Sequence, residues 1–150
     1  MIPLRLTVKN FMCYRENVPS LELEDIHVAC LCGNNGHGKS AILDAITWAL
    51  WGQARARTQE ELIHQGRQDM AVELEFTARD RRYRANRRYS KSSGSKSGAT
   101  LLELQVASDG EFTPITGNSV RDTENRIREL LHMDYETFVN TAFLLQGQAD

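Results

Sequence analysis

The sequence predicts an α/β fold in which a buried strand, a glycine-rich loop and a helix are followed by an antiparallel meander of strands. Three observations support this. Residues 26–31 are short and almost wholly apolar, which is typical of a strand covered on both faces. Glycines recur from Gly33 to Gly38, and apolar residues at helical spacing follow as far as Trp51. Between residues 70 and 116, short segments alternate apolar and polar side chains, as half-buried strands do.

The N-terminal half supplies the first elements. Residues 4–9 alternate apolar and polar side chains, which predicts a half-buried strand, and residues 18–23 are a second candidate. After the glycine-rich loop, the apolar spacing predicts a helix over residues 40–51, and Gly52 is a suitable residue for its C-terminal end. The polar residues that follow predict little beyond a helical turn at residues 60–64.

The second half predicts the meander and two helices. A loop rich in Ser, Gly and Lys at residues 90–98 and a turn at Asp109-Gly110 separate its strands. Ser119 begins a capping-box pattern that predicts a helix, and Asp134 is a candidate cap for a shorter one. The predicted strands of the meander are residues 70–76, 83–89, 102–106 and 112–115.

The composition excludes several classes of protein. Hydrophobic residues make up 41% and charged residues 25% of the 150 residues, which is close to the globular average and excludes a disordered chain. No stretch approaches the roughly 20 apolar residues that a membrane helix needs. Three cysteines cannot all pair, which argues against a disulfide scaffold and favours a reducing compartment. We expect the core to contain Cys13, Cys30, Cys32, Trp48 and Trp51.

The residues from Gly33 to Ser40 match the pattern G-x-x-x-x-G-K-[ST]. Its glycines let successive backbone N–H groups turn toward phosphate oxygens, and the following helix adds a partial positive charge at its N-terminus. In this pattern Lys39 reaches the β- and γ-phosphates, and the Ser40 hydroxyl binds Mg²⁺. The motif predicts an ATP and Mg²⁺ site at Asn34, Asn35, Gly36, His37, Gly38, Lys39, Ser40 and Ala41.

Two alternatives stay open for this motif. The segment could be a glycine-rich surface turn with an incidental lysine, although the flanking strand and helix patterns argue against that. His37 either faces solvent, since the loop uses its backbone there, or its charge responds to a bound triphosphate.

One expected part of an ATPase is missing. A complete site also needs an acidic residue that holds Mg²⁺ and positions water, at the end of an apolar strand. No run of four apolar residues leads into Asp, and residues 72–75 alternate instead. We therefore expect these 150 residues to supply one part of a site whose other part comes from elsewhere.

Three segments together resemble a known family. Residues 6–11, 33–46 and 142–148 occur in the same order as in the N-terminal lobe of SMC-like ABC ATPases. The segment Phe143-Leu-Leu-Gln-Gly147 is the most specific of them, and it resembles the DNA double-strand-break repair branch called SbcC or Rad-fifty.

The resemblance implies an architecture. Residues 1–150 would form the N-terminal lobe of a split ABC-type ATPase head, followed by a coiled coil and a C-terminal lobe with the signature motif and the acidic strand. Two such heads, as a homodimer, would sandwich two ATP molecules and work with a nuclease on double-stranded DNA. The location implied is the bacterial cytoplasm, at the nucleoid, or a nucleus. The lobe alone would bind nucleotide weakly and would not hydrolyse it.

The resemblance also implies roles for residues outside the loop. Gln146 corresponds to the Q-loop glutamine, which would reach Mg²⁺ and the γ-phosphate. The sequence departs from the family at position 12, where Arg is common. Contacts with the base and ribose are implied for Met12, Cys13, Ile63, His64 and Gln65.

A basic segment offers a candidate DNA surface. Residues 79–96 contain eight Lys and Arg side chains and one acid, Asp80. Alternation along the strand would place Arg82, Arg84 and Arg88 on one face, where they could contact phosphates without reading base sequence. The alternatives are an ordinary solvated strand face, or pairing of these arginines with Glu73, Glu75 and Glu103 on neighbouring strands.

Other functions compete with the repair ATPase. A RecF-type or SMC-type ATPase shares the glycine-rich loop. A small P-loop kinase would need an acceptor site and a lid, which the residues after Gly52 do not clearly provide. A non-enzymatic module would bind nucleotide only to control a protein interface.

Overall fold

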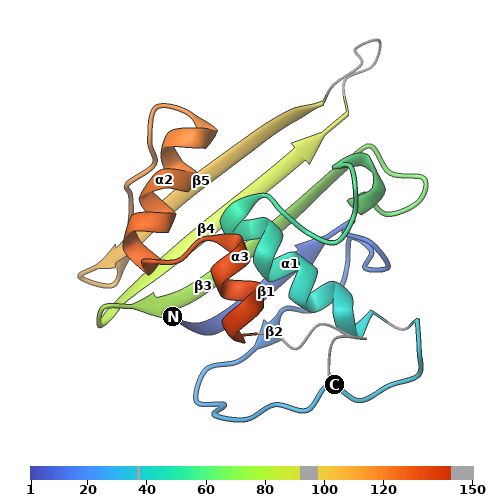
Figure 1. The fold of residues 1–150 in the computed structure, drawn as a ribbon, viewed down its shortest axis with the longest axis horizontal. Helices are drawn as coiled ribbons and strands as arrows, with labels where there is room; N and C mark the ends of the chain where they lie inside the picture. Colours follow the sequence, from blue (N-terminus) through green and yellow to red (C-terminus); the bar gives the residue numbers. More distant parts are fainter. Residues whose placement is uncertain (37, 92–97, 143–150) are drawn as a thin grey trace.

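The computed structural model describes residues 1–36, 38–91 and 98–142 of the chain. Within these ranges the strands form one antiparallel sheet in the order β2-β1-β3-β4-β5-β6 (Figure 1). The strands are β1 (Ile2–Lys9), β2 (Leu21–Glu22), β3 (Asp69–Ala78), β4 (Arg81–Ser90), β5 (Ala99–Ser108) and β6 (Glu111–Pro114). The helices are α1 (Lys39–Trp51), the 3-10 turn η1 (Glu60–Leu62), α2 (Val120–Leu131) and α3 (Tyr135–Ala142).

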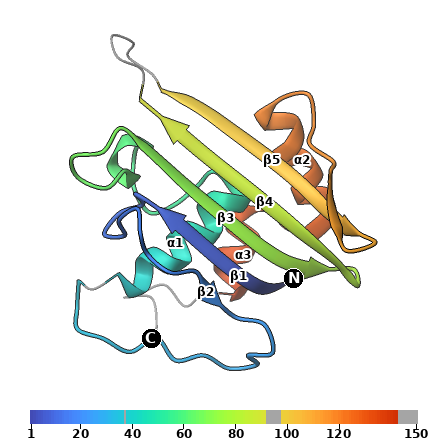
Figure 2. The same cartoon turned by 180° about the vertical axis from the view of Figure 1, so that it is seen from behind.

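Helices cover one face of the sheet and leave the other bare. The ribbon shows α1, α2 and α3 on the same side (Figure 1), and the view from behind shows β1, β3, β4 and β5 with no helix in front of them (Figure 2). Alternation along the strands explains this asymmetry. On β4, Tyr83, Ala85 and Tyr89 are buried toward the helices, whereas Arg82 and Arg84 point to the bare face, which we call the open face.

The core lies between α1 and the centre of the sheet. Trp48 is fully buried, and its ring lies 5.6 Å from that of Phe11, at the end of β1. Trp51 is 6% exposed and packs against Phe138 of α3 at 4.8 Å. The prediction that both tryptophans serve packing is therefore confirmed. This packing fixes the direction of α1, and hence of the loop that precedes it.

The predicted meander is confirmed. Strands β3, β4, β5 and β6 pair in sequence order, each antiparallel to the last. Asp109 and Gly110 have φ angles of 52° and 83°, which is the left-handed conformation that a tight hairpin turn requires. The Ser119 hydroxyl accepts a hydrogen bond from the Asp122 amide at 3.1 Å, so the predicted helix cap is also present.

The predicted buried strand at residues 26–31 is wrong. This segment belongs to the irregular connection between β2 and α1, and the sheet is antiparallel throughout the described residues. Val28 is 91% exposed, and Ile26 and Leu31 are exposed as well. An apolar strand needs neighbouring strands and a cover on both faces. The described residues supply neither beside residues 26–31.

The cysteine prediction fails for a related reason. Cys30 and Cys32 lie in the exposed segment, and Cys13 lies in the turn after β1, so all three are exposed rather than in the core. The predicted strand at residues 18–23 shortens to Leu21–Glu22, which pair with β1 at the sheet edge. Among the described residues, none of the helices has the length and apolar character required to cross a bilayer.

Candidate phosphate site and basic sheet face

The glycine-rich loop leads directly into α1. Gly36 and Gly38 have φ angles of 83° and 87°, which side-chain-bearing residues rarely adopt. Gly38 is the N-cap of α1 and provides no side-chain cap, and the first turn of the helix contains no acidic residue. The amide donors at the start of α1 are therefore left for a ligand, and the end of the helix attracts an anion.

Lys39 folds back over the loop. Its Nζ donates to the carbonyl oxygen of Gly33 at 2.6 Å and to that of Asn34 at 2.8 Å. Because these two carbonyls belong to the first two residues of the motif, the Lys39 ammonium connects the end of the loop with its beginning. A phosphate group that enters the loop would exchange these neutral acceptors for charged ones, which bind an ammonium more strongly.

A hollow of about 650 Å³ opens at the N-terminus of α1. We call it the α1 hollow. It brings together eight residues predicted from the sequence and one that was not, Arg55. The lining residues are Met12, Cys13, Asn35, Gly36, Gly38, Lys39, Ser40, Ala41 and Arg55.

The residues of the α1 hollow fit a triphosphate with Mg²⁺. Lys39 and Arg55 supply positive charge, Ser40 supplies a hydroxyl of the kind that Mg²⁺ accepts as a ligand, and the helix start supplies amide donors. A Cβ at Gly36 would meet nothing within 4 Å, whereas one at Gly38 would lie 2.5 Å from Cys13 Sγ. The loop is thus open at Gly36 and in contact with the turn after β1 at Gly38. His37 and Gln146 lie outside the described residues.

The segment predicted to contact the base lies beside the turn after β1. The Met12 amide donates to the Leu62 carbonyl at 2.7 Å, and the Met12 carbonyl lies 2.7 Å from His64 Nδ1. The structure therefore brings Met12 and His64 together. Ile63 is buried in the core and Gln65 is exposed. Within the described residues, the lining of the α1 hollow takes no side chain from residues 63–65.

Sequence reasoning missed Arg55 and Tyr14. Arg55 follows the end of α1 in a polar stretch with no periodicity, and only the fold brings it to the hollow that Ser40 also lines. Its guanidinium binds the buried carboxylate of Asp44, with Nη2 2.6 Å from Oδ2. The hydrogen bond to Asp44 raises the pKa of Arg55 above its ordinary value, against the effect of burial. The Tyr14 hydroxyl donates to the Gly38 carbonyl at 3.0 Å.

The open face carries a cluster of arginines around one carboxylate. Glu75 of β3 accepts hydrogen bonds from Arg5 at 2.7 Å, Arg82 at 2.7 Å and Arg84 at 2.9 Å, and its side chain is 2% exposed. Burial raises the pKa of the Glu75 carboxyl, but hydrogen bonds from Arg82 and Arg84 and the charge of Arg5 outweigh it and hold the pKa below its usual value. The predicted alternative, in which these arginines pair with a glutamate on a neighbouring strand, is therefore confirmed for Arg82 and Arg84.

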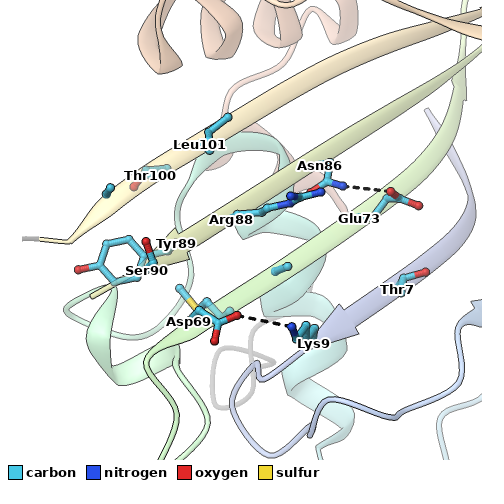
Figure 3. Close-up of a pocket in the computed structure, with 13 residues that line it drawn as sticks. Thr7, Lys9, Asp69, Glu73, Asn86, Arg88, Tyr89, Ser90, Thr100 and Leu101 are labelled. Carbon is cyan, nitrogen blue, oxygen red and sulfur yellow. Dashed lines mark hydrogen bonds and ion pairs between the residues drawn. The ribbon is translucent and has the colours of Figure 1, made fainter. Parts of the chain in front are cut away.

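Arg88 lies on the same face in a different environment. It lines a second hollow of about 650 Å³, the sheet hollow, together with Lys9 and Asp69 (Figure 3). Lys9 Nζ lies 3.7 Å from Asp69 Oδ2, whereas Arg88 Nε donates to the neutral Asn86 Oδ1 at 3.3 Å. Within the part of the chain that the structure describes, Arg88 forms no ion pair.

The chain is similar to known proteins of DNA repair. A model of the AAA domain matches residues 5–150. The SbcC component of the nuclease SbcCD from Deinococcus radiodurans is 34% identical over 99% of this chain and 16% of that protein. "DNA double-strand break repair Rad50 ATPase" of Halobacterium salinarum is 35% identical over 97% of this chain and 16% of that protein. The chain therefore spans about one sixth of the length of these relatives.

A similar solved structure is that of the recombination mediator protein RecF with ATP. It is 20% identical to this chain, with a TM-score of 0.48, and the match covers 78% of this chain and 29% of that one.

Proposed function

Since the chain belongs to the AAA-domain family, we propose that it is the ATP-binding N-terminal lobe of an SMC-like DNA repair ATPase. The family agrees with the resemblance seen in the sequence. The names of its relatives, a component of the SbcCD nuclease and Rad50 ATPases, support ATP turnover and DNA double-strand-break repair as the setting.

The main support for the proposal is that Lys39 and Ser40 both line a hollow at the start of α1, where no side chain caps the helix. Lys39 would exchange its two loop carbonyls for the β- and γ-phosphates, and the loop amides would bind the remaining phosphate oxygens. Ser40 would hold Mg²⁺, which screens phosphate charge when bound. Gln146 would be a further Mg²⁺ ligand, and Asn34 and His37 would contribute through the backbone of the loop.

The exposed apolar segment at residues 26–31 is an argument for a second lobe that would cover it. Exposure of these apolar side chains to water, Val28 most of all, is unfavourable. The composition of the segment is that of a strand covered on both faces. In our proposal the C-terminal lobe supplies the neighbouring strands and also the acidic residue that the site lacks. Hydrolysis would therefore require both lobes, and residues 1–150 alone would be inactive.

The partners follow from the same proposal. Two complete heads would form a homodimer around two ATP molecules, and a nuclease would act with them on DNA. On the open face, Arg88 would contact DNA phosphates, with Arg82 and Arg84 contributing less because Glu75 already offsets their charge. A coiled coil would separate the two lobes.

The test is complementation of two purified pieces. ATP hydrolysis is measured for residues 1–150, for the C-terminal lobe, and for an equimolar mixture. The proposal predicts turnover only in the mixture. Robust turnover by residues 1–150 alone, or phosphoryl transfer to a nucleoside acceptor, would contradict it, and the second result would favour a small kinase.

A further inference from the structure

We infer that Tyr14 is a positioning residue for the phosphate site, which it serves by fixing the peptide between Gly38 and Lys39. The inference rests on the proposed function, because it concerns how the loop is prepared for ATP. Tyr14 lies outside the G-x-x-x-x-G-K-[ST] motif and reaches it from the turn after β1.

Tyr14 fixes the orientation of the peptide between Gly38 and Lys39 through a hydrogen bond. The Tyr14 hydroxyl donates to the Gly38 carbonyl oxygen at 3.0 Å, and the Ile42 amide donates to the same oxygen at 3.3 Å. In a trans peptide the carbonyl oxygen and the next N–H point in opposite directions. Holding the Gly38 oxygen toward Tyr14 and Ile42 therefore turns the Lys39 N–H the opposite way. That N–H is among the helix donors without an intrahelical acceptor.

Packing reinforces the hydrogen bond. A Cβ added to Gly38 would lie 3.0 Å from the Tyr14 hydroxyl oxygen and 3.1 Å from Tyr14 Cζ, so the ring lies directly against the loop backbone. Gly38 has a φ of 87°, which glycine adopts freely, so the residue by itself does not fix the orientation of the peptide that follows it. Tyr14 thus restrains both the plane and the position of this peptide.

Tyr14 is itself held by the core. Its amide donates to the Phe11 carbonyl at 2.9 Å, and Phe11 is fully buried against Trp48 of α1. The Met12 amide donates to the Leu62 carbonyl, which ties the same turn to a third segment. Burial, followed by the charge of Cys13, raises the pKa of Tyr14 above its ordinary value of 10.0, so the hydroxyl remains a donor at neutral pH.

The test uses Tyr14→Phe in the complete ATPase, which keeps the ring and removes only the donor. Two quantities are measured: the Kd for a non-hydrolysable ATP analogue, and the amide ¹⁵N–¹H resonance of Lys39 without nucleotide. We expect Kd to rise about five-fold, because one neutral hydrogen bond is lost. We also expect the Lys39 amide resonance to shift and its hydrogen to exchange faster. Tyr83→Phe, which makes the same chemical change on β4, is the matched control and should leave both quantities unchanged.

The result that would overturn the inference is a Lys39 resonance and a Kd equal to those of the wild type. The resonance is recorded without nucleotide, so it tests the role of Tyr14 even where ATP binding fails. If the wild type does not bind the analogue, the proposed function fails instead. A merely structural role would lower the thermal stability of the nucleotide-free protein and leave the Lys39 amide unmoved, which would also overturn the inference.

Discussion

Arg55 Nη2 lies 2.6 Å from Asp44 Oδ2, and the Arg55 backbone amide donates to Oδ1 of the same carboxylate at 3.2 Å. Asp44 is 4% exposed on α1, one helical turn after Ser40. The pair therefore ties the segment after α1 back to the start of the helix. It also holds a guanidinium at the rim of the α1 hollow, among the residues that we propose bind phosphate.

Replacing Arg55 by Ala should lower the free energy of unfolding by about 2 kcal/mol, because a buried carboxylate loses its charged hydrogen-bond donors. Arg55→Lys should recover only part of this, since an ammonium cannot reproduce the fork of donors that a guanidinium offers. Urea denaturation at pH 7 measures both variants. Equal midpoints for Arg55→Ala and the wild type would contradict the role of the pair.

The Glu75 cluster predicts how stability depends on pH. The pKa of Glu75 is held below its usual value in the folded chain, so the folded state binds its proton less readily than the unfolded state. Its contribution is thus present above the ordinary Glu value of 4.5 and is lost as the pH falls through the lower folded pKa.

Glu75→Gln should therefore flatten the fall in Tm on acidification below about pH 4.5. Thermal unfolding followed at several pH values measures it. Glu103→Gln, an exposed carboxylate on the same sheet face, serves as the control and should leave the slope as it is in the wild type. A Glu75→Gln profile that still parallels the wild type below pH 4.5 would show that another group controls the acid transition.

Glu124 should be important for stability because it is the charge partner of the buried Arg87. Arg87 is 2% exposed, and its Nη1 donates to Glu124 Oε1 at 2.9 Å while its Nε donates to the Ala49 carbonyl. Burial lowers the pKa of Arg87, and Glu124 opposes that effect. Glu124→Gln should cost about 3 kcal/mol. Guanidinium denaturation checks this against Glu129→Gln on the exposed side of α2, and similar losses for the two variants would refute it.

DNA binding should depend more on Arg88 than on Arg84. Arg84 shares Glu75 with two other arginines, whereas Arg88 contacts the neutral Asn86. Because each phosphate contact contributes to the slope of log K against log salt, Arg88→Gln should flatten that slope by about one, and Arg84→Gln by less. The slope is measured for the complete head on duplex DNA. Equal slopes for the wild type, Arg88→Gln and Arg84→Gln would mean that the open face does not contact DNA.

The sequence predicts those elements whose partners lie nearby in the chain. Strands β3 to β6 pair with their sequence neighbours, so alternation and a turn signal at Asp109-Gly110 were sufficient to identify them. The helix α1 and its end at Gly52 were also predicted, since spacing and the glycine cap are local signals.

What the sequence could not predict depends on distant or absent neighbours. Residues 26–31 have the composition of a buried strand, yet Val28 is exposed because burial is a property of surrounding layers and not of the segment. The same holds at the site. The motif identifies Lys39 and Ser40, but the contributions of Tyr14 and Arg55 arise only when β1 and the end of α1 fold beside the loop.

Binding of ATP phosphates by residues 33–40 is tested by the affinity of the complete head for a non-hydrolysable ATP analogue, with and without Lys39→Met. Isothermal titration in the presence of Mg²⁺ measures it. We expect the wild type to bind the analogue and Lys39→Met to bind it about 100-fold more weakly, because two charged hydrogen bonds are lost. Equal affinities for the two proteins would contradict it.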